Sequence, residues 1–280
     1  MDHCEKLFKI WRKYAKESII GTTRLGAPIP LYRTGESPQT LIVAAVHARE
    51  YVTADLVTGI FCGSDKSFDV IPVLNIDGVR LSLYGADGLD SKLRSRLLII
   101  NGSSDFSNWK ANAFGVDINV NFNADWGTGK SNVKYVSSAN YIGPYPESEP
   151  ETRAVTNLIR SGNYAQVVAY HAKGEVVYHG FKNNRLHYDL AKRYADALGY
   201  ELQYAYGSAG GLKDYFDVVC DGLGLTVEVG EDRFPHPYPM TEIDRLIDKH
   251  KGSVDILYEN GNEVARRLHG AGIKRGGRSV

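Results

Sequence analysis

Metal-binding side chains stand where apolar segments of the sequence stop. The segment "LIVAAVHARE" places His47 and Glu50 three residues apart, just after a run of aliphatic residues. His171 follows a second such run, "QVVAY", and Glu228 lies in a third, "LTVEVG". Two imidazoles and one carboxylate can hold a zinc ion with one coordination position left open, and a further carboxylate nearby can act as a general base. This combination of residue types favours metal-assisted hydrolysis.

Each of these residues also has an ordinary structural explanation. A histidine at a strand end is commonly a hydrogen-bonded residue without a ligand, and Glu228 could be a structural acid paired with a base. His47 and Glu50 could be surface residues at a strand-to-helix turn. Spacing alone therefore leaves both a zinc site and a set of structural polar residues open.

The four side chains need strands that end at one edge of a sheet. Segments rich in Val, Ile and Leu alternate with amphipathic ones, which is typical of an α/β fold. We expect a three-layer α/β/α sandwich with a mixed, mostly parallel central sheet, in which ligands bind outside the carboxyl ends of the strands. Strands are expected at 28–35, 39–47, 67–78 and 223–230, and on both sides of a polar turn within 164–180. Helices are expected at 5–16, 50–61, 148–162, 184–199 and 210–220, with one long helix at 241–268. The stretch from Leu81 to Pro150 is rich in Gly, Asn and Ser, which predicts an irregular region, either a functional loop or a flexible one.

Length, charge and cysteine content narrow the class of protein. The 280 residues are 43% hydrophobic, and 33 Lys and Arg balance 33 Asp and Glu. We expect one catalytic domain over 1–280, with a C-terminal helix at 240–269 and a flexible tail at 270–280. Zero net charge without a basic run argues against a nucleic-acid partner. The N-terminal segment lacks the apolar core of a signal peptide or membrane span, so we expect a cytoplasmic protein with no membrane partner. Three cysteines without CxxC spacing argue against a disulfide framework.

Five segments follow one another in the order of a known family. They are "HARE", "PVLNIDG", "GVDINVNF", "AYHAKGEVVY" and "LTVEVG". They resemble, in turn, the H-x-x-E ligand motif, the NPDG turn, the GVDLNRNF segment, the second-histidine strand and the catalytic-glutamate strand of zinc carboxypeptidases of the carboxypeptidase A type. The resemblance runs from about 24 to 239. It implies that His47, Glu50 and His171 bind one zinc ion, and that Glu228 takes a proton from the attacking water and passes it to the leaving amine.

The resemblance also implies roles for residues that contact the substrate. Lys110 aligns with an arginine that stabilises the carbonyl oxyanion, and Arg49 with an arginine that contacts substrate. Tyr206 precedes "GSAGGLKDY" and resembles the tyrosine that closes over bound substrate. Asn119 matches the asparagine of an Asn-Arg pair that holds the terminal carboxylate, but Val120 replaces the arginine. The ordinary alternatives are solvated cations and a structural tyrosine.

The substitution at Val120 bears on the substrate. Another cation, Arg49 or Arg80, could hold the carboxylate instead. The segments "WKANAFGVD", "GPYPESEPETRAV", "YHAKGEVVYH" and "GSAGGLKDYF" resemble the bacterial branch that cuts the γ-D-glutamyl-diaminopimelate bond of murein peptides. We expect a muropeptide substrate of this kind, with Lys213 and Asp214 binding its second amino-carboxylate group. The alternatives are a carboxypeptidase for ordinary peptides and a relative that binds peptides without cleaving them.

Overall fold

Eight strands form one mixed sheet at the centre of the computed structural model, which describes residues 1–181 and 186–271. The strand order is β1-β2-β4-β3-β5-β8-β6-β7. The four middle strands β4, β3, β5 and β8 are parallel to one another, whereas β1, β2 and β6 join by antiparallel pairing. The strands are β1 (Lys16–Thr22), β2 (Pro28–Arg33), β3 (Thr40–Val43), β4 (Asp69–Ile71), β5 (Gln166–Ala172), β6 (Val176–His179), β7 (Glu201–Tyr204) and β8 (Leu223–Val229).

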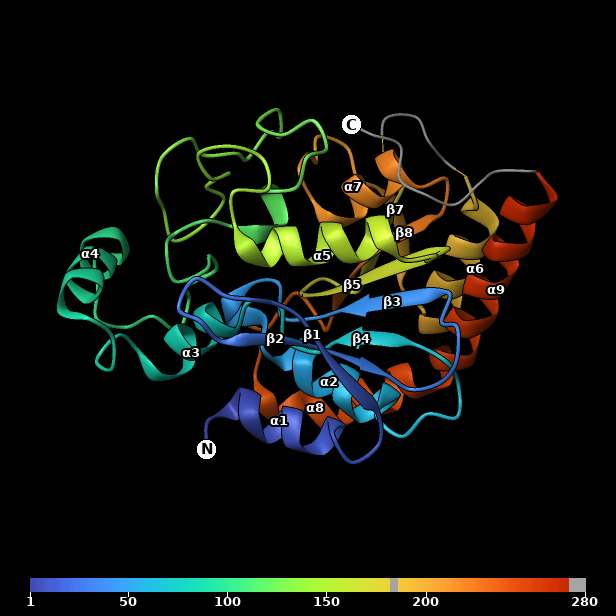
Figure 1. The fold of residues 1–280 in the computed structure, drawn as a ribbon, viewed down its shortest axis with the longest axis horizontal. Helices are drawn as coiled ribbons and strands as arrows, with labels where there is room; N and C mark the ends of the chain where they lie inside the picture. The colour runs from blue at the N-terminus through green and yellow to red at the C-terminus, as the bar shows by residue number, and fades with distance from the viewer. Residues whose placement is uncertain (182–185, 272–280) are drawn as a thin grey trace.

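Helices cover both faces of the sheet (Figure 1). Helices α5 and α7 lie on one face, and α1, α2 and α8 lie on the other, while α6 and α9 pack against each other at one end. The helices are α1 (His3–Trp11), α2 (Val52–Phe61), α3 (Ile76–Tyr84), α4 (Ser91–Asn101), α5 (Pro150–Ser161), α6 (Tyr188–Leu198), α7 (Leu212–Val219), α8 (Ile243–His250) and α9 (Val254–Gly270). Short 3-10 turns are η1 (Ala48–Glu50), η2 (Ile118–Val120), η3 (Met240–Glu242) and η4 (Lys251–Ser253). The predicted three-layer α/β/α fold is confirmed.

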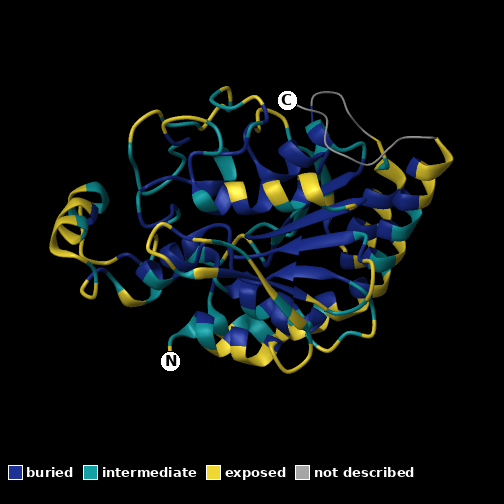
Figure 2. Cartoon of the chain, in the orientation of Figure 1, coloured by how far each residue is buried: buried dark blue, intermediate teal, exposed yellow. Residues whose placement is uncertain are grey.

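The core is centred on the parallel strands (Figure 2). Every residue of β3 and β5 is buried, as expected for strands covered by helices on both faces. Their aliphatic and aromatic side chains join those of α2, β4 and β8 in one hydrophobic cluster. A smaller cluster lies under α3 and α4 and includes Leu81, Leu97 and Trp109. This rigid interior supports the strand ends that carry the predicted site.

Two strands were not predicted from the sequence. Strand β1 follows the first helix, which ends at Trp11 and not at residue 16 as predicted. Strand β7 follows α6. Both are edge strands, and their residues are exposed or only partly buried, so neither shows the apolar run or regular alternation that identifies a strand.

Three predicted segments were wrong in part. Strand β4 is only three residues long, and α3 begins at Ile76 inside the segment predicted as a strand and turn. Helix α4 lies in the stretch predicted as irregular; only Leu97 of this helix is buried, so its apolar residues form no clear face. The single C-terminal helix is two helices, because the 3-10 turn Lys251–Ser253 separates α8 from α9.

Two further expectations concern the limits of the chain. Residues 272–280 of the expected flexible tail, and the first two residues of the helix expected at 184–199, lie outside the described residues. The single catalytic domain over 1–280 stays a prediction. No helix in the described ranges is long and apolar enough to cross a membrane.

Candidate metal centre and active site

His47, Glu50 and His171 form a buried cluster at the carboxyl ends of β3 and β5. His47 Nδ1 lies 2.8 Å from Glu50 Oε1 and 3.1 Å from His171 Nδ1, and His171 Nδ1 lies 3.0 Å from Glu50 Oε2. Each side chain is at most 7% exposed. Three potential ligand atoms from two distant parts of the chain therefore converge on one point.

Loops fixed by buried hydrogen bonds position His47 and Glu50. Strand β3 ends four residues before His47, which precedes the 3-10 turn that carries Glu50. Thr53 Oγ1 donates to the carbonyl of Glu50 (2.8 Å) and accepts from the Ala45 N–H (2.9 Å). The two ligands are therefore held by the turn and the start of α2 together.

Asn75 anchors the same loop from the neighbouring element. Its buried amide donates to the carbonyls of Val46 (3.2 Å) and Ala111 (3.1 Å). Its carbonyl oxygen accepts from the Gly78 N–H and caps α3. The "PVLNIDG" segment, predicted to end in a turn, thus begins a helix and holds the backbone that leads to His47.

The cluster has the geometry and the donor atoms of a zinc site. A tetrahedral zinc with bonds of about 2.0–2.1 Å places its ligand atoms about 3.3 Å apart, close to the separations of 2.8–3.1 Å found here. Burial opposes ionisation of Glu50, but the charge of His47 and hydrogen bonds from both histidines hold its pKa well below the usual value. Glu50 is therefore ionised, as a metal ligand must be.

Glu228 lies beside His171 because β5 and β8 are parallel neighbours. In the register of these strands, His171 pairs with Glu228. Burial raises the pKa of Glu228 to about 7 and the charge of Glu50 adds to this, whereas His171, Lys110 and Arg49 lower it. The structure thus brings the predicted base next to the predicted metal ligands.

Asp117 joins His47 to Lys110 and was not singled out from the sequence. Its carboxylate is fully buried, with Oδ1 at 3.2 Å from His47 Nε2 and Oδ2 at 2.7 Å from Lys110 Nζ. Despite burial, the charges of Lys110 and His47 lower the pKa of Asp117 far below its usual value. A carboxylate behind a ligating histidine orients the ring and strengthens metal binding. Asp117 lies in the segment "GVDINVNF", and the resemblance of that segment to the family motif is the sequence feature that points to it.

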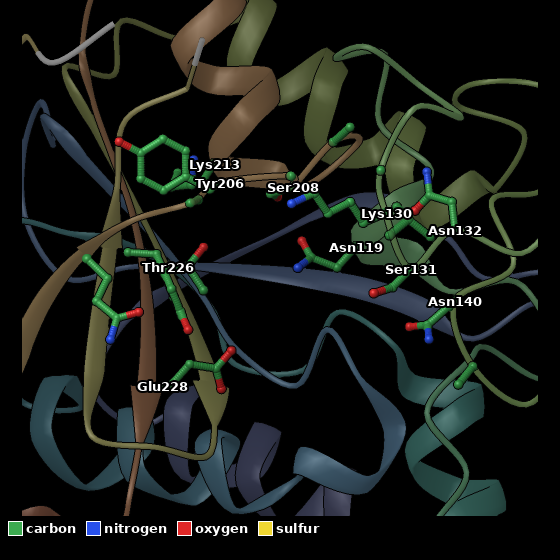
Figure 3. A pocket seen from close by; sticks show the side chains of 18 of the residues that line it. Asn119, Lys130, Ser131, Asn132, Asn140, Tyr206, Ser208, Lys213, Thr226 and Glu228 are labelled. Atoms are coloured by element: carbon green, nitrogen blue, oxygen red, sulfur yellow. The ribbon is translucent and has the colours of Figure 1, made fainter. Parts of the chain in front are cut away.

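A cavity of about 800 Å³ opens beside the cluster (Figure 3). It brings together most of the predicted substrate-contacting residues. Its wall includes, among others, Arg49, Lys110, Asn119, Val120, Lys130, Tyr178, Gln203, Tyr206, Lys213, Thr226 and Glu228. Tyr206 is 75% exposed at this wall, whereas Lys213 is 3% exposed. The volume is in the range of pockets that enclose a small peptide or drug-sized ligand.

Asp214 and Arg80, two other candidates from the sequence, do not line the cavity and form ion pairs within the protein. Asp214 is not part of the cavity wall; its carboxylate accepts from Lys213 Nζ (2.6 Å) and Ser208 Oγ (2.7 Å). Arg80 lies away from the cavity, because its guanidinium pairs with Asp2 at 2.7 Å. The suggestion that Arg80 replaces the missing arginine at Val120 is therefore wrong, because Arg80 does not line this cavity.

A buried cluster of three potential metal ligands at the carboxyl edge of a mixed α/β sheet, with a carboxylate beside it, is the type of site found in metallohydrolases. The zinc carboxypeptidase family (peptidase M14) matches residues 64–246. Gamma-D-glutamyl-L-diamino acid endopeptidase 1 of Lysinibacillus sphaericus is 30% identical over 258 residues, which cover 83% of this chain. Mast cell carboxypeptidase A of Mus musculus is 30% identical over 68% of this chain. The chain spans 64% of the length of the first relative and 51% of the second.

Solved structures share the fold at low sequence identity. Bovine thrombin-activatable fibrinolysis inhibitor, in complex with tick carboxypeptidase inhibitor, aligns with a TM-score of 0.72 at 18% identity, over 92% of this chain and 94% of that one. Murein-tripeptide amidase MpaA from Escherichia coli O157 aligns with a TM-score of 0.58 at 22% identity, over 86% and 91%.

This chain belongs to the zinc carboxypeptidase family, which confirms the predicted family. The cofactor of this family is one zinc ion, and the His-Glu-His cluster fits it. The predicted ligands His47 and Glu50 precede the matched range, so their position rests on the structure.

Proposed function

We propose that this chain is a zinc-dependent peptidase that hydrolyses an amide bond near the C-terminus of a peptide, with the γ-D-glutamyl-diaminopimelate bond of murein peptides as its substrate. The observation that carries the proposal is the convergence of His47, Glu50 and His171 beside a cavity whose wall contains Glu228. A catalytic centre needs both an open space for substrate and a base within reach of it. Cytoplasmic muropeptides are the substrates that fit the location expected from the sequence.

The residues of the chain divide the chemistry between them. Zinc held by His47, Glu50 and His171 would polarise the scissile carbonyl and lower the pKa of both a water molecule and the neighbouring Glu228. Glu228 then accepts the proton of the attacking water and donates it to the leaving nitrogen. Lys110 and Arg49 line the cavity together with Glu228, interact electrostatically with it, and would contribute positive charge where the oxyanion forms.

The polar wall of the cavity supports a substrate with a polar end group. Lys213, Thr226 and Gln203 line it together with Tyr178, so the side-chain pocket is not an apolar slot. The side chain of diaminopimelate carries an ammonium and a carboxylate, and it needs such partners. The relative from Lysinibacillus sphaericus is named for a bond between γ-D-glutamate and a diamino acid, which supports the same substrate class.

The second candidate is a carboxypeptidase for ordinary peptides. The similarity to mast cell carboxypeptidase A favours it. A relative that only binds peptides is less well supported, because Glu228 stands in register with His171, and binding alone gives no chemical reason for a base there.

Product analysis separates these candidates. The zinc-loaded protein is incubated with L-Ala-γ-D-Glu-meso-diaminopimelate and with peptides that end in Leu or Phe, and Glu228→Gln is the matched blank. Free diaminopimelate, released only by the unchanged protein, is the expected result. Equal release of Leu or Phe would show that the protein is a carboxypeptidase for ordinary peptides and would overturn the murein substrate. Binding of one zinc without cleavage of any peptide would overturn the peptidase itself.

A further inference from the structure

Four cations line the cavity, and acids neutralise two of them. Lys110 Nζ lies 2.7 Å from Asp117 Oδ2, and Lys213 Nζ lies 2.6 Å from Asp214 Oδ1. These ion pairs reduce the ability of either lysine to bind a further full negative charge. Arg49 and Lys130 line the same cavity without an ion pair to a described residue.

Arg49 lies at the reacting centre and not away from it. It sits in the 3-10 turn between His47 and Glu50, so its backbone is held by the two ligands. Its charge acts on Glu228. A C-terminal carboxylate is separated from the scissile carbonyl by a whole residue. The cation that binds this carboxylate must therefore lie farther from Glu228 than Arg49 does in the 3-10 turn Ala48–Glu50.

Lys130 lies apart from Glu228 in the same cavity (Figure 3). Figure 3 shows its side chain extending into the cavity on the side of Asn119 and Ser208. Its ammonium makes no hydrogen bond or ion pair within the described ranges 1–181 and 186–271. The positive charge is therefore available to a ligand.

Contacts with the loop after β7 fix the stem of Lys130. The Lys130 N–H donates to the carbonyl of Gly207 (3.1 Å), and the aliphatic part of Lys130 crosses Gly207 so closely that a Cβ there would lie 2.7 Å from Lys130 Cδ. Gly207 has φ +77°, which favours glycine for a second reason. The same loop reaches Val120, because a Cβ on Gly210 would lie 2.7 Å from the carbonyl oxygen of Val120.

We propose that Lys130 binds the terminal carboxylate of the substrate, on the side of the cavity near Asn119. Lys130 would thereby take the place of the family's arginine, which is Val120 in this chain. The inference rests on the proposed peptidase function and adds to it the residue that recognises the chain end. Because Lys130 is attached to Gly207, the carboxylate site and Tyr206 form one unit. A bound carboxylate thus fixes the loop that carries Tyr206 over the substrate.

Direct binding tests the assignment without turnover. The zinc-loaded Glu228→Gln protein is titrated calorimetrically with L-Ala-γ-D-Glu-meso-diaminopimelate, with a peptide ending in Phe, and with the C-terminal carboxamide of each. A charge-assisted contact predicts that Lys130→Gln weakens binding of the free acids about 10–100-fold and leaves the carboxamides unchanged. Lys130→Arg should retain most of the affinity. Lys134→Gln is the matched control, because Lys134 is exposed in the same loop and is not part of the cavity wall.

The outcomes separate this inference from the function on which it rests. Unchanged preference for the free acid in Lys130→Gln, or loss of that preference in Arg49→Gln alone, overturns the role of Lys130. If the unchanged protein cleaves no peptide but the Lys130→Gln variant loses the preference, the carboxylate site stands and the peptidase function fails. If neither free acid binds, both proposals fail.

Discussion

Asp117 should control metal affinity although it contacts no metal-facing atom. Its carboxylate faces the Nε2 of His47, whereas the Nδ1 of His47 faces Glu50 and His171. The variant Asp117→Asn keeps the shape and removes the charge. Loss of a carboxylate behind a ligating histidine costs about 10–100-fold in metal affinity, equivalent to about 1.4–2.7 kcal/mol.

The same substitution removes the ion-pair partner of Lys110, whose ammonium also donates to Asn140 Oδ1 (2.9 Å), and this gives a second observable. A hydrogen bond to a charged group is worth about 1.5–3 kcal/mol. The protein without metal should therefore melt about 3–12 °C lower, on the scale of about 2–4 °C per kcal/mol that applies to chains of about 150–250 residues. The two effects are separable, because zinc affinity depends on the His47 contact and the apo stability on both.

Competition with a fluorescent zinc chelator measures the affinity, and differential scanning calorimetry measures the melting temperature of the apo form. Asp248→Asn is the control, because Asp248 is 72% exposed and pairs with Lys251 at the surface, where such pairs contribute little. The reasoning is refuted if Asp117→Asn lowers the melting temperature as expected but changes zinc affinity by less than about twofold. Asp117 would then support the fold without supporting the metal.

Three further predictions concern stability and the Lys130 loop. Burial raises the pKa of Glu151 to about 7, and neither of its carboxyl oxygens has a described partner. Protonated Glu151 therefore stabilises the folded state fully below the unfolded pKa near 4.5, and this stabilisation is lost as pH rises through about 7. Glu151→Gln should thus raise the free energy of unfolding in urea by about 3 kcal/mol at pH 8 and by little at pH 4; equal gains at both pH values would contradict this. Asn75→Asp keeps the cap of α3 but loses both donated hydrogen bonds, so the free energy of unfolding should fall by about 2–4 kcal/mol and chelator competition should show weaker zinc binding. Unchanged zinc affinity would mean that Asn75 does not position the cluster. Gly207→Ala should displace Lys130 and weaken binding of the free-acid peptide, and Gly199→Ala, which has a similar positive φ and open space around it, should not; equal effects would trace the loss to backbone strain.

The candidate metal ligands could be singled out from the sequence because their chemistry and their position give the same signal. His47 and His171 follow apolar runs that are buried strands or their continuation, and few other residues are both ligand-forming and placed at a strand end. The register that sets Glu228 beside His171 follows from β5 and β8 being neighbours. That neighbour relation is a property of sheet order, which local sequence does not contain.

The residues that sequence reasoning missed depend on long-range contacts. Lys130 lies in a polar stretch without periodicity, and its place in the cavity depends on Gly207, far away in the chain. Helix α4 had boundary signals that could have been used: Asp90 accepts from the N–H groups of Lys92 and Leu93, and Gly102 ends the helix with φ +68°. Its weak apolar face concealed it.

The pairing of His171 with Glu228 across two buried strands has an evolutionary consequence. Both residues belong to the sheet, so their spacing is set by backbone hydrogen bonds of the core, whereas Lys130 and Tyr206 belong to surface loops. Under the proposed roles, insertions or exchanges in those loops would change which chain end is recognised, while the distance between His171 and Glu228 would stay constant. The proposed catalytic residues therefore lie on the core sheet and the proposed specificity residues on loops, so the substrate could change without a change in the catalytic residues.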